Sequence, residues 1–133
     1  MTLKDYFENT SGLCILSSAD QSGKVTTAVY SAPRVMDDGM VCFLMRERLT
    51  YRNILENPHA ACMFIERGAG YQGVRLFLKK VREDNDPALI TRMTRRHLSP
   101  QEDQAKGPKH LVIFSVDRIL PLIGDGETGI TIR

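Results

Sequence analysis

Short runs of apolar and β-branched residues, separated by turn residues, occupy most of this chain. Their spacing predicts strands at residues 13–18, 24–36, 40–45, 59–66, 72–82 and 111–116, the last continuing toward residue 122. Tight-turn sequences such as Asp37-Asp38-Gly39 lie between the runs. We expect the first three strands to form a meander.

Two short helices are expected to interrupt the strands. Thr50 is the expected N-cap of a helix over residues 50–56, and Pro58 ends it because the residue before a proline avoids helical geometry. Asp86 is expected to cap a second helix that holds Pro87 in its first turn. Residues 99–109 are polar, which predicts a mobile loop.

The predicted order is β-β-β-α-β-β-α-β, which does not alternate as a doubly wound sheet requires. An antiparallel barrel removes the sheet edges, so the predicted fold class is mainly β with short helices (α+β), a six-stranded antiparallel split β-barrel. At 133 residues and 15.0 kDa, the chain is expected to form a single domain over residues 1–133.

Two of the predicted strands carry features that restrict their place in the barrel. Pro33 has no N–H to donate and lies inside the second strand, so an edge, a bulge or a bend is expected there. The strand over residues 59–66 is apolar on both faces at its centre, so both faces must be covered. Cover by a second subunit predicts a homodimer, and cover by the second helix is the alternative.

Composition and charge argue against several classes of partner. A net charge of +2 is too small for the concentrated basic face of a nucleic-acid binder, and we interpret the run Arg92, Arg95 and Arg96 as a solvated helix face. No apolar run approaches the about 18 residues of a membrane helix, and the polar N-terminus lacks a signal-peptide core, so a cytoplasmic protein is expected. No metal site is expected, and three buried, reduced thiols are predicted at Cys14, Cys42 and Cys62.

A glycine motif at residues 68–73 matches the Gly-x-Gly-x-x-Gly pattern of dinucleotide-binding sites. That site requires the third glycine to open a helix whose N-terminus holds the pyrophosphate. Residues 74–78 alternate with a period of two and predict a strand instead. We therefore interpret the motif as a hairpin loop.

Three arginines and a threonine gather where the third strand passes into the first helix, namely Arg46, Arg48, Thr50 and Arg52. The N-terminus of a helix is already positive, so guanidinium groups there repel that field and one another. A bound phosphate would remove the conflict, because guanidinium, hydroxyl and free amide groups are the donors that it needs. A solvated basic turn, relieved by Glu47 and Glu56, is the alternative.

The stretch over residues 39–58 resembles the FMN-binding split barrels of the pyridoxamine 5'-phosphate oxidase-like family. In that family a strand runs into a phosphate-binding turn, a short helix that closes on Asn-Pro follows, and the next strand is apolar. Here residues 46–50 match the turn, and Asn57-Pro58 closes the helix. Residues 71–76 are similar to the family's following strand, so the resemblance covers residues 13–86 and, loosely, the last strand.

This resemblance implies an FMN at the interface of a homodimer. In this arrangement Val29, Tyr30 and Ser31 offer backbone groups to the edge of the flavin ring, and Leu44 and Met45 pack beside the ring. The residues Arg46, Arg48, Thr50 and Arg52 bind the phosphate, and Gln72 reaches over from the other subunit. In chain order, these implied cofactor-binding residues are Val29, Tyr30, Ser31, Leu44, Met45, Arg46, Arg48, Thr50, Arg52 and Gln72.

The sequence also departs from the family in three places. Family members often carry Ser-Arg-Lys at the phosphate turn, where this chain has Arg48-Leu49-Thr50. The basic residues that bind the cofactor in true pyridoxamine-phosphate oxidases fall near Ala28 and Pro33, and the C-terminal segment that holds their substrate has no counterpart. Vitamin B6 oxidation is therefore disfavoured.

The resemblance implies an FMN-dependent oxidoreductase of unknown substrate. No catalytic side chain is predicted, because a flavin carries hydride or electrons by its own chemistry. The alternatives are a non-enzymatic flavin carrier or sensor, an electron-transfer module, or the same pocket holding a deazaflavin or haem. A barrel without a cofactor, with its arginines serving a nucleic-acid phosphate, is the last alternative.

Overall fold

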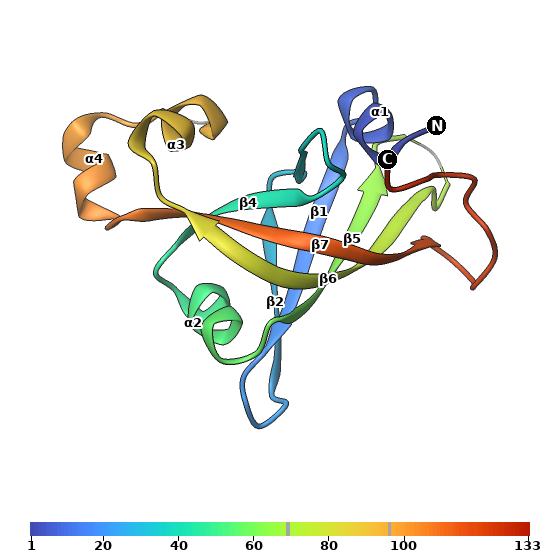
Figure 1. Ribbon diagram of the computed structural model, residues 1–133, viewed down its shortest axis with the longest axis horizontal. Helices are drawn as coiled ribbons and strands as arrows, with labels where there is room; N and C mark the ends of the chain where they lie inside the picture. Colours follow the sequence, from blue (N-terminus) through green and yellow to red (C-terminus); the bar gives the residue numbers. More distant parts are fainter. Residues whose placement is uncertain (69, 96) are drawn as a thin grey trace.

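The structure is a computed structural model that describes residues 1–68, 70–95 and 97–133. Ala69 of the glycine motif and Arg96 of the basic run lie outside the described residues. Within them, four short helices accompany seven strands (Figure 1): α1 (Leu3–Glu8), β1 (Gly12–Ala19), β2 (Val25–Tyr30), β3 (Arg34–Val35), β4 (Val41–Arg46), α2 (Leu49–Glu56), β5 (His59–Glu66), β6 (Gly73–Asp84), α3 (Pro87–Met93), α4 (Pro100–Ala105) and β7 (Lys109–Pro121).

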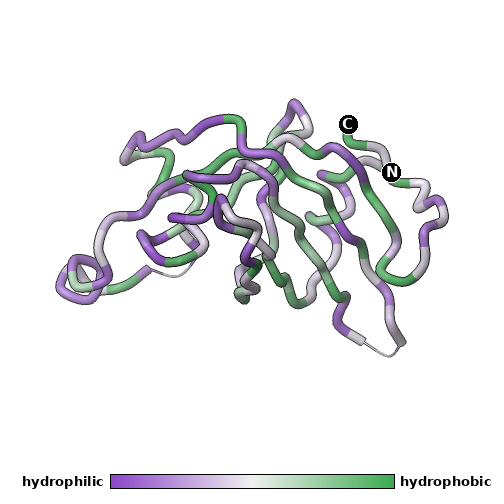
Figure 2. Tube along the Cα trace, turned by 90° about the horizontal axis from the view of Figure 1, so that it is seen from below, coloured by the Kyte–Doolittle hydropathy of each residue, from purple (hydrophilic) through white to green (hydrophobic). Residues whose placement is uncertain are grey.

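All seven strands belong to one antiparallel sheet that curls into a half-barrel. Their order across the sheet is β2-β1-β5-β6-β7-β4-β3, which leaves β2 and β3 at the two edges. The long strands β6 and β7 pair with each other through two register irregularities, which help a sheet to bend. Seen from below in Figure 2, hydrophobic and hydrophilic segments alternate along the chain.

The prediction of six strands was wrong, because the second predicted strand divides at Pro33. Its first part is β2, which pairs with β1, and its second part is β3, which pairs with β4 on the opposite edge of the sheet. Without a backbone N–H, Pro33 cannot continue a ladder, so the chain crosses there from one edge to the other. The consecutive pairings of the predicted meander are present, since β1 pairs with β2 and β3 with β4. The two pairs lie at opposite ends of the sheet, however, because β1 also pairs with β5 and β4 with β7.

The helices differ from the predictions in three places. The N-cap of α2 is Arg48 rather than Thr50, which lies in the first turn and is buried. The predicted loop at residues 99–109 contains α4, with Ser99 as its cap. Residues 3–8, for which no element was predicted, form α1. The N-terminal end of this helix lies beside the C-terminal tail through a bridge between Thr2 and Thr131.

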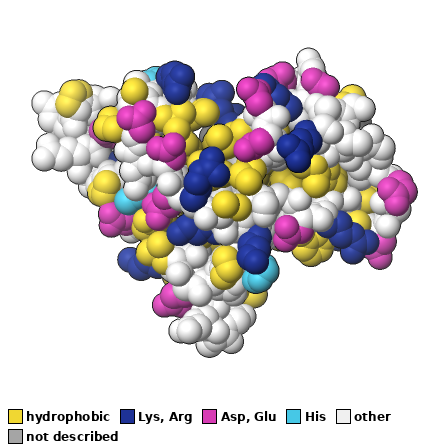
Figure 3. Space-filling model, viewed as in Figure 1, with side chains coloured by type: hydrophobic (Ala, Val, Ile, Leu, Met, Phe, Trp, Pro, Cys, Tyr) yellow, Lys and Arg dark blue, Asp and Glu magenta, His cyan; other side chains and the backbone are white. Residues whose placement is uncertain are grey.

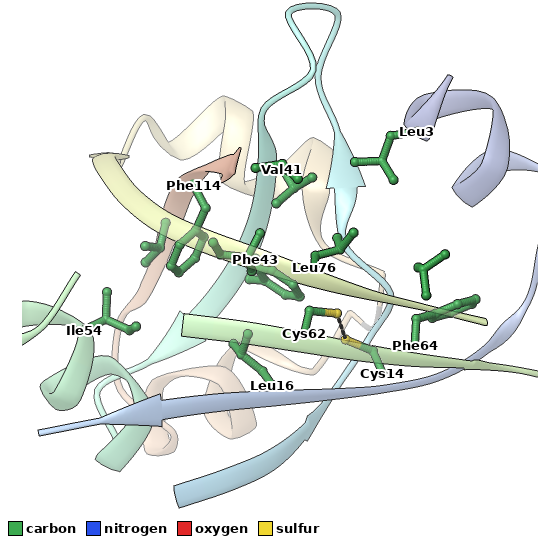
Figure 4. Close-up of a cluster of buried hydrophobic side chains, with 14 of the residues drawn as sticks. Leu3, Cys14, Leu16, Val41, Phe43, Ile54, Cys62, Phe64, Leu76 and Phe114 are labelled. Carbon is green, nitrogen blue, oxygen red and sulfur yellow. Dashed lines mark hydrogen bonds between the residues drawn. The ribbon is translucent and has the colours of Figure 1, made fainter. Parts of the chain in front are cut away.

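A hydrophobic core fills the inside of the half-barrel (Figure 4). Phe64 and Phe114 are fully buried, and Phe43 packs edge-on against Phe114 with ring centroids 5.9 Å apart. Cys14 and Cys62 face each other across β1 and β5 with their Sγ atoms 3.2 Å apart. As expected, all three cysteines are buried and reduced.

A second, smaller core lies on the outer face of β4 and β7, where α3 packs. Leu89, Ile90 and Met93 of α3 cover a cluster of three buried side chains, Cys42, Leu111 and Ile113. Asp86 caps this helix as predicted, since its carboxylate accepts a hydrogen bond from the Leu89 N–H at 3.2 Å. The cap matters for function because α3 forms one wall of the cavity described below.

Removing this cap is expected to weaken the fold by a modest amount. Loss of an Asp N-cap costs about 1 kcal/mol because a helix N–H is left without its partner. We therefore expect Asp86→Ala to lower the free energy of unfolding by about 1 kcal/mol, measured by urea denaturation. Asp86→Asn keeps a capping oxygen and serves as the control. An equal loss in both variants would contradict the capping role.

The outer face of β5 remains uncovered within the described part of the chain. Ala61, Met63 and Ile65 on this face are only half-buried, whereas Cys62 and Phe64 on the inner face are buried. The helix α3, which is the second helix predicted from the sequence, packs on β4 and β7 instead. The alternative that this helix covers β5 is therefore excluded. No helix among the described residues is long and apolar enough to cross a membrane.

Candidate functional site

A cavity of about 270 Å³ opens between the sheet edge at β2 and the outer face of β4. Its walls come from the end of β2, from β4, from the start of β7 and from the end of α3. We call it the β2–β4 cavity, and its lining residues include Val29, Tyr30, Ser31, Leu44, Arg46 and Arg95. The cavity exists because the chain crosses from one edge to the other at Pro33, which leaves β2 and β4 close in space but unpaired.

A second hollow of about 330 Å³ continues from this cavity toward the start of α2. It shares Val29, Tyr30, Leu44 and Arg46 with the β2–β4 cavity. We call it the α2 hollow, because its far end is formed by the turn into that helix, at Arg48, Leu49 and Thr50. Together the two spaces form an elongated groove along β4.

The start of α2 has the properties of an anion site. No side chain caps the helix and its first turn holds no acid, so its first amide groups have no side-chain acceptor. Arg48 is exposed at the N-cap, and no ion pair joins it to an acid in the part of the chain that the structure describes. An anion in the α2 hollow would meet a guanidinium, a hydroxyl and free amides at once.

The Tyr30 side chain stands between the two spaces. It packs edge-on against Phe43 across the gap between β2 and β4, with ring centroids 5.8 Å apart. Burial raises the pKa of Tyr30, while a hydrogen bond with Thr50 and the charge of Arg48 oppose this shift. Tyr30 and Thr50 both line the α2 hollow, and the raised pKa of the phenol keeps it protonated at neutral pH.

Arg46 differs from Arg48 because acid and carbonyl groups already bind it. Its Nη2 lies 2.7 Å from Asp103 Oδ1, and its Nη1 donates to the carbonyl oxygens of Asp103 and Gly107. Lys109 also approaches Asp103, at 3.6 Å. Hydrogen bonding from Arg46 holds the pKa of Asp103 below its usual range. Arg46 thus ties the segment around α4 to β4, and its charge is partly neutralised.

Two contacts hold α2 in place beneath this groove. Asn53 is buried and donates from Nδ2 to Ser18 Oγ at 3.2 Å, which fastens the helix to β1. Tyr51 donates to both carboxylate oxygens of Glu83, at 2.9 and 3.0 Å, and its ring stacks on His110 at 4.4 Å. The turn that carries Arg48 is therefore anchored from three strands, β1, β6 and β7.

Seven of the ten predicted site residues line these two spaces, namely Val29, Tyr30, Ser31, Leu44, Arg46, Arg48 and Thr50. The other three do not. Met45 is fully buried in the inner core, Arg52 is exposed on α2 outside both spaces, and Gln72 is exposed in the turn before β6. Gly73 opens β6 and not a helix, which confirms the rejection of the dinucleotide motif.

Among the lining residues of the β2–β4 cavity that sequence reasoning missed, five carry polar or ionisable side chains, namely Arg34, Cys42, Thr94, Arg95 and Lys109. They come from β3, β4, β7 and the end of α3. One signal in the sequence was the basic residue directly after Pro33. The basic run was another, but its interpretation as a solvated helix face was wrong for Arg95, which follows α3 and lines the cavity. Over the face seen in Figure 3, basic and acidic side chains are interspersed with hydrophobic ones.

The groove offers binding groups rather than reactive ones. Its described lining combines backbone at an open sheet edge, apolar side chains and several cations. No cluster of three or more His, Cys, Asp or Glu suited to a metal ion occurs among residues 1–68, 70–95 and 97–133. Burial raises the pKa of the Cys42 thiol to about 11, so this thiol is not a nucleophile at neutral pH.

No family model matches this sequence. No curated protein matches it either.

Solved structures, by contrast, share its fold. An FMN-binding protein from Syntrophomonas wolfei subsp. wolfei superposes with a TM-score of 0.71 at 18% identity, over 91% of this chain and 84% of that one. An F420 reductase gives a TM-score of 0.63 at 18% identity, over 81% and 88% of the two chains. A candidate pyridoxamine 5'-phosphate oxidase from Lactobacillus delbrueckii gives 0.63 at 15% identity, over 86% of each chain. The chain therefore has the split-barrel fold of the pyridoxamine 5'-phosphate oxidase-like proteins.

Proposed function

We propose that the groove along β4 binds FMN and that the protein is a flavin-dependent oxidoreductase-like protein. The observation that carries this proposal is the uncapped start of α2, where Arg48 and Thr50 face the α2 hollow without an acid to balance them. The phosphate of FMN is a dianion of the size and charge that such a donor set accepts. The fold supports the proposal, because one neighbour is an FMN-binding protein.

In this proposal the flavin ring lies in the β2–β4 cavity. Backbone groups of Val29 to Ser31 belong to the end of an edge strand and are available to the polar rim of the ring. Leu44 offers an apolar surface for the ring itself, and Tyr30 closes the passage between ring and phosphate. When bound, FMN would supply the hydride or electron transfer, and the chain would bind, orient and shield it.

We further propose that the protein acts as a homodimer through the outer face of β2, β1, β5 and β6. Ile15 lies directly opposite Val29 on one side and Met63 on the other, which makes an apolar row across three strands. Val29 is 71% exposed and also lines the cavity, so this face is continuous with the groove. A second copy packed there would cover the row and help to close the cavity.

A deazaflavin is the second candidate ligand, because an F420 reductase shares the fold. A flavin carrier or electron-transfer module would use the same groove without a substrate site. Haem is disfavoured, since no histidine is among the described residues that line the two spaces.

The absorbance of the purified protein, followed by ligand titration, tests the proposal. We expect yellow protein, or colourless protein that binds added FMN with a dissociation constant in the micromolar range or below. A Soret band would indicate haem, and tighter binding of F420 than of FMN would indicate the deazaflavin. Protein that neither FMN nor F420 stabilises against heat would refute a flavin site.

A further inference from the structure

Two arginines line the end of the β2–β4 cavity that is remote from α2. Arg34 is paired with Cys42 in the register of β3 and β4, whereas Arg48 follows the other end of β4. Arg95 follows α3, and both Arg34 and Arg95 line the cavity and a neighbouring hollow that reaches α1. The two guanidinium groups therefore lie about one strand length from the start of α2.

The charges of this pair are not balanced by acids of the described chain. No ion pair joins Arg34 or Arg95 to an acid in the described ranges. Glu8 is the acid that lines the neighbouring hollow, but it is well exposed and approaches Lys4 at 3.9 Å. Arg95 is exposed as a residue, but partial desolvation in the cavity lowers its pKa, and the charge of Arg34 lowers it further, so the two groups repel each other.

The hydrogen-bonding groups of the pair are also incomplete. Arg34 Nε is buried and has no hydrogen-bond partner among the described residues. Arg95 donates from Nη1 to the Ala32 carbonyl oxygen, which orients its guanidinium but adds no negative charge. A buried donor without a partner costs about 1–3 kcal/mol, and more where the group is charged. An oxyanion between the two guanidinium groups would satisfy the donor and offset the repulsion.

We propose that Arg34 and Arg95 form a second anion subsite, which binds a carboxylate or phosphate group of the molecule that reacts at the cavity. The role as a substrate subsite rests on the proposed flavin function, whereas anion binding by the pair does not. With FMN phosphate at α2, the ring would lie between the two anion sites. The substrate or electron donor would then be an acidic molecule, held by its charged group at the Arg34 end.

The experiment measures the binding of small oxyanions to the FMN-loaded protein by isothermal titration calorimetry. Inorganic phosphate and acetate serve as separate probes, at an ionic strength held constant with potassium chloride. We expect saturable binding of at least one probe, and the stronger probe identifies the anionic group preferred. Arg34→Gln combined with Arg95→Gln is expected to weaken that binding at least about tenfold, as the loss of charge-assisted hydrogen bonds predicts.

Controls separate this subsite from the proposed phosphate site of FMN. Arg92→Gln removes an exposed arginine of α3 that lines neither space and should leave oxyanion binding unchanged. Arg34→Lys keeps a charge and should retain part of the binding, and circular dichroism verifies that each variant folds. FMN affinity of the double variant should stay within about threefold of wild type, because its phosphate is expected at α2.

The outcomes of the two proposals are distinguishable. If FMN binds but neither probe saturates, or if the double variant binds the probe as wild type does, the subsite is refuted and the flavin site stands. If no flavin binds, the proposed function fails. The probes are then titrated into ligand-free Arg48→Ala protein, where dependence on Arg34 and Arg95 still supports the subsite and its absence refutes it.

Discussion

Replacing Arg48 by alanine is expected to weaken the binding of FMN by about 10- to 100-fold. A hydrogen bond to a charged group contributes about 1.5–3 kcal/mol, and each 1.4 kcal/mol is about tenfold in affinity. Arg48 is exposed at the N-cap of α2 and makes no capping bond, so its removal should leave the free protein stable. Fluorescence titration with FMN measures the effect directly, because bound flavin changes its emission.

Riboflavin provides the test of mechanism, since it keeps the ring and lacks the phosphate. Arg48→Ala should change riboflavin affinity by no more than about threefold, because the lost charge-assisted hydrogen bond acts on the phosphate alone. Arg52→Ala is the matched control from the same helix, since Arg52 lies outside both lining sets. Equal losses for FMN and riboflavin, or a larger loss in Arg52→Ala, would show that the anion does not bind at the start of α2.

Much of the fold could be predicted because each local signal acts over a few residues. The strand over residues 59–66 is observed with the same bounds as β5, and Asp86 with Pro87 starts α3 as their chemistry predicts. The pairing of the strands was harder to predict from the sequence. Pro33 indicated a bend, but its consequence depends on where the chain goes next, and here it sends β3 to the far edge of the sheet. Such long-range choices leave no periodic signal in the sequence.

Two of the predicted contacts lie outside the groove for a geometric reason. Successive residues of a strand point to opposite faces, so Leu44 and Met45 cannot both line the groove, and Met45 is the one that faces the core. Arg52 follows Thr50 by two positions, which places it on a different side of the helix. Arg34 and Arg95 were missed because they come from segments about 60 residues apart, and only the packing of α3 on β4 brings them together.

The largest effect on assembly is expected from a charge at the centre of the apolar outer face. In the proposed dimer, Ile15→Asp would bury a carboxylate between Val29 and Met63, which lie opposite it on the neighbouring strands. A buried charge without a partner costs about 3–5 kcal/mol, and twofold symmetry would place one on each subunit. We expect wild-type protein with a mass near twice 15.0 kDa to become monomeric in this variant at micromolar concentration. Native mass spectrometry or light scattering measures the change.

Two further variants test whether the loss of the dimer is specific to this face. Phe77 is 44% exposed on the same face, so Phe77→Asp should also yield monomer without disturbing the core. Leu55 is 55% exposed on α2, outside the face, and Leu55→Asp should leave the dimer intact. Because Val29 belongs to both the face and the groove, the monomeric variants should bind FMN more weakly than Leu55→Asp does. A wild-type protein that is monomeric, or a folded Phe77→Asp that remains dimeric, would show that this face does not join two copies and that the groove is complete in one chain.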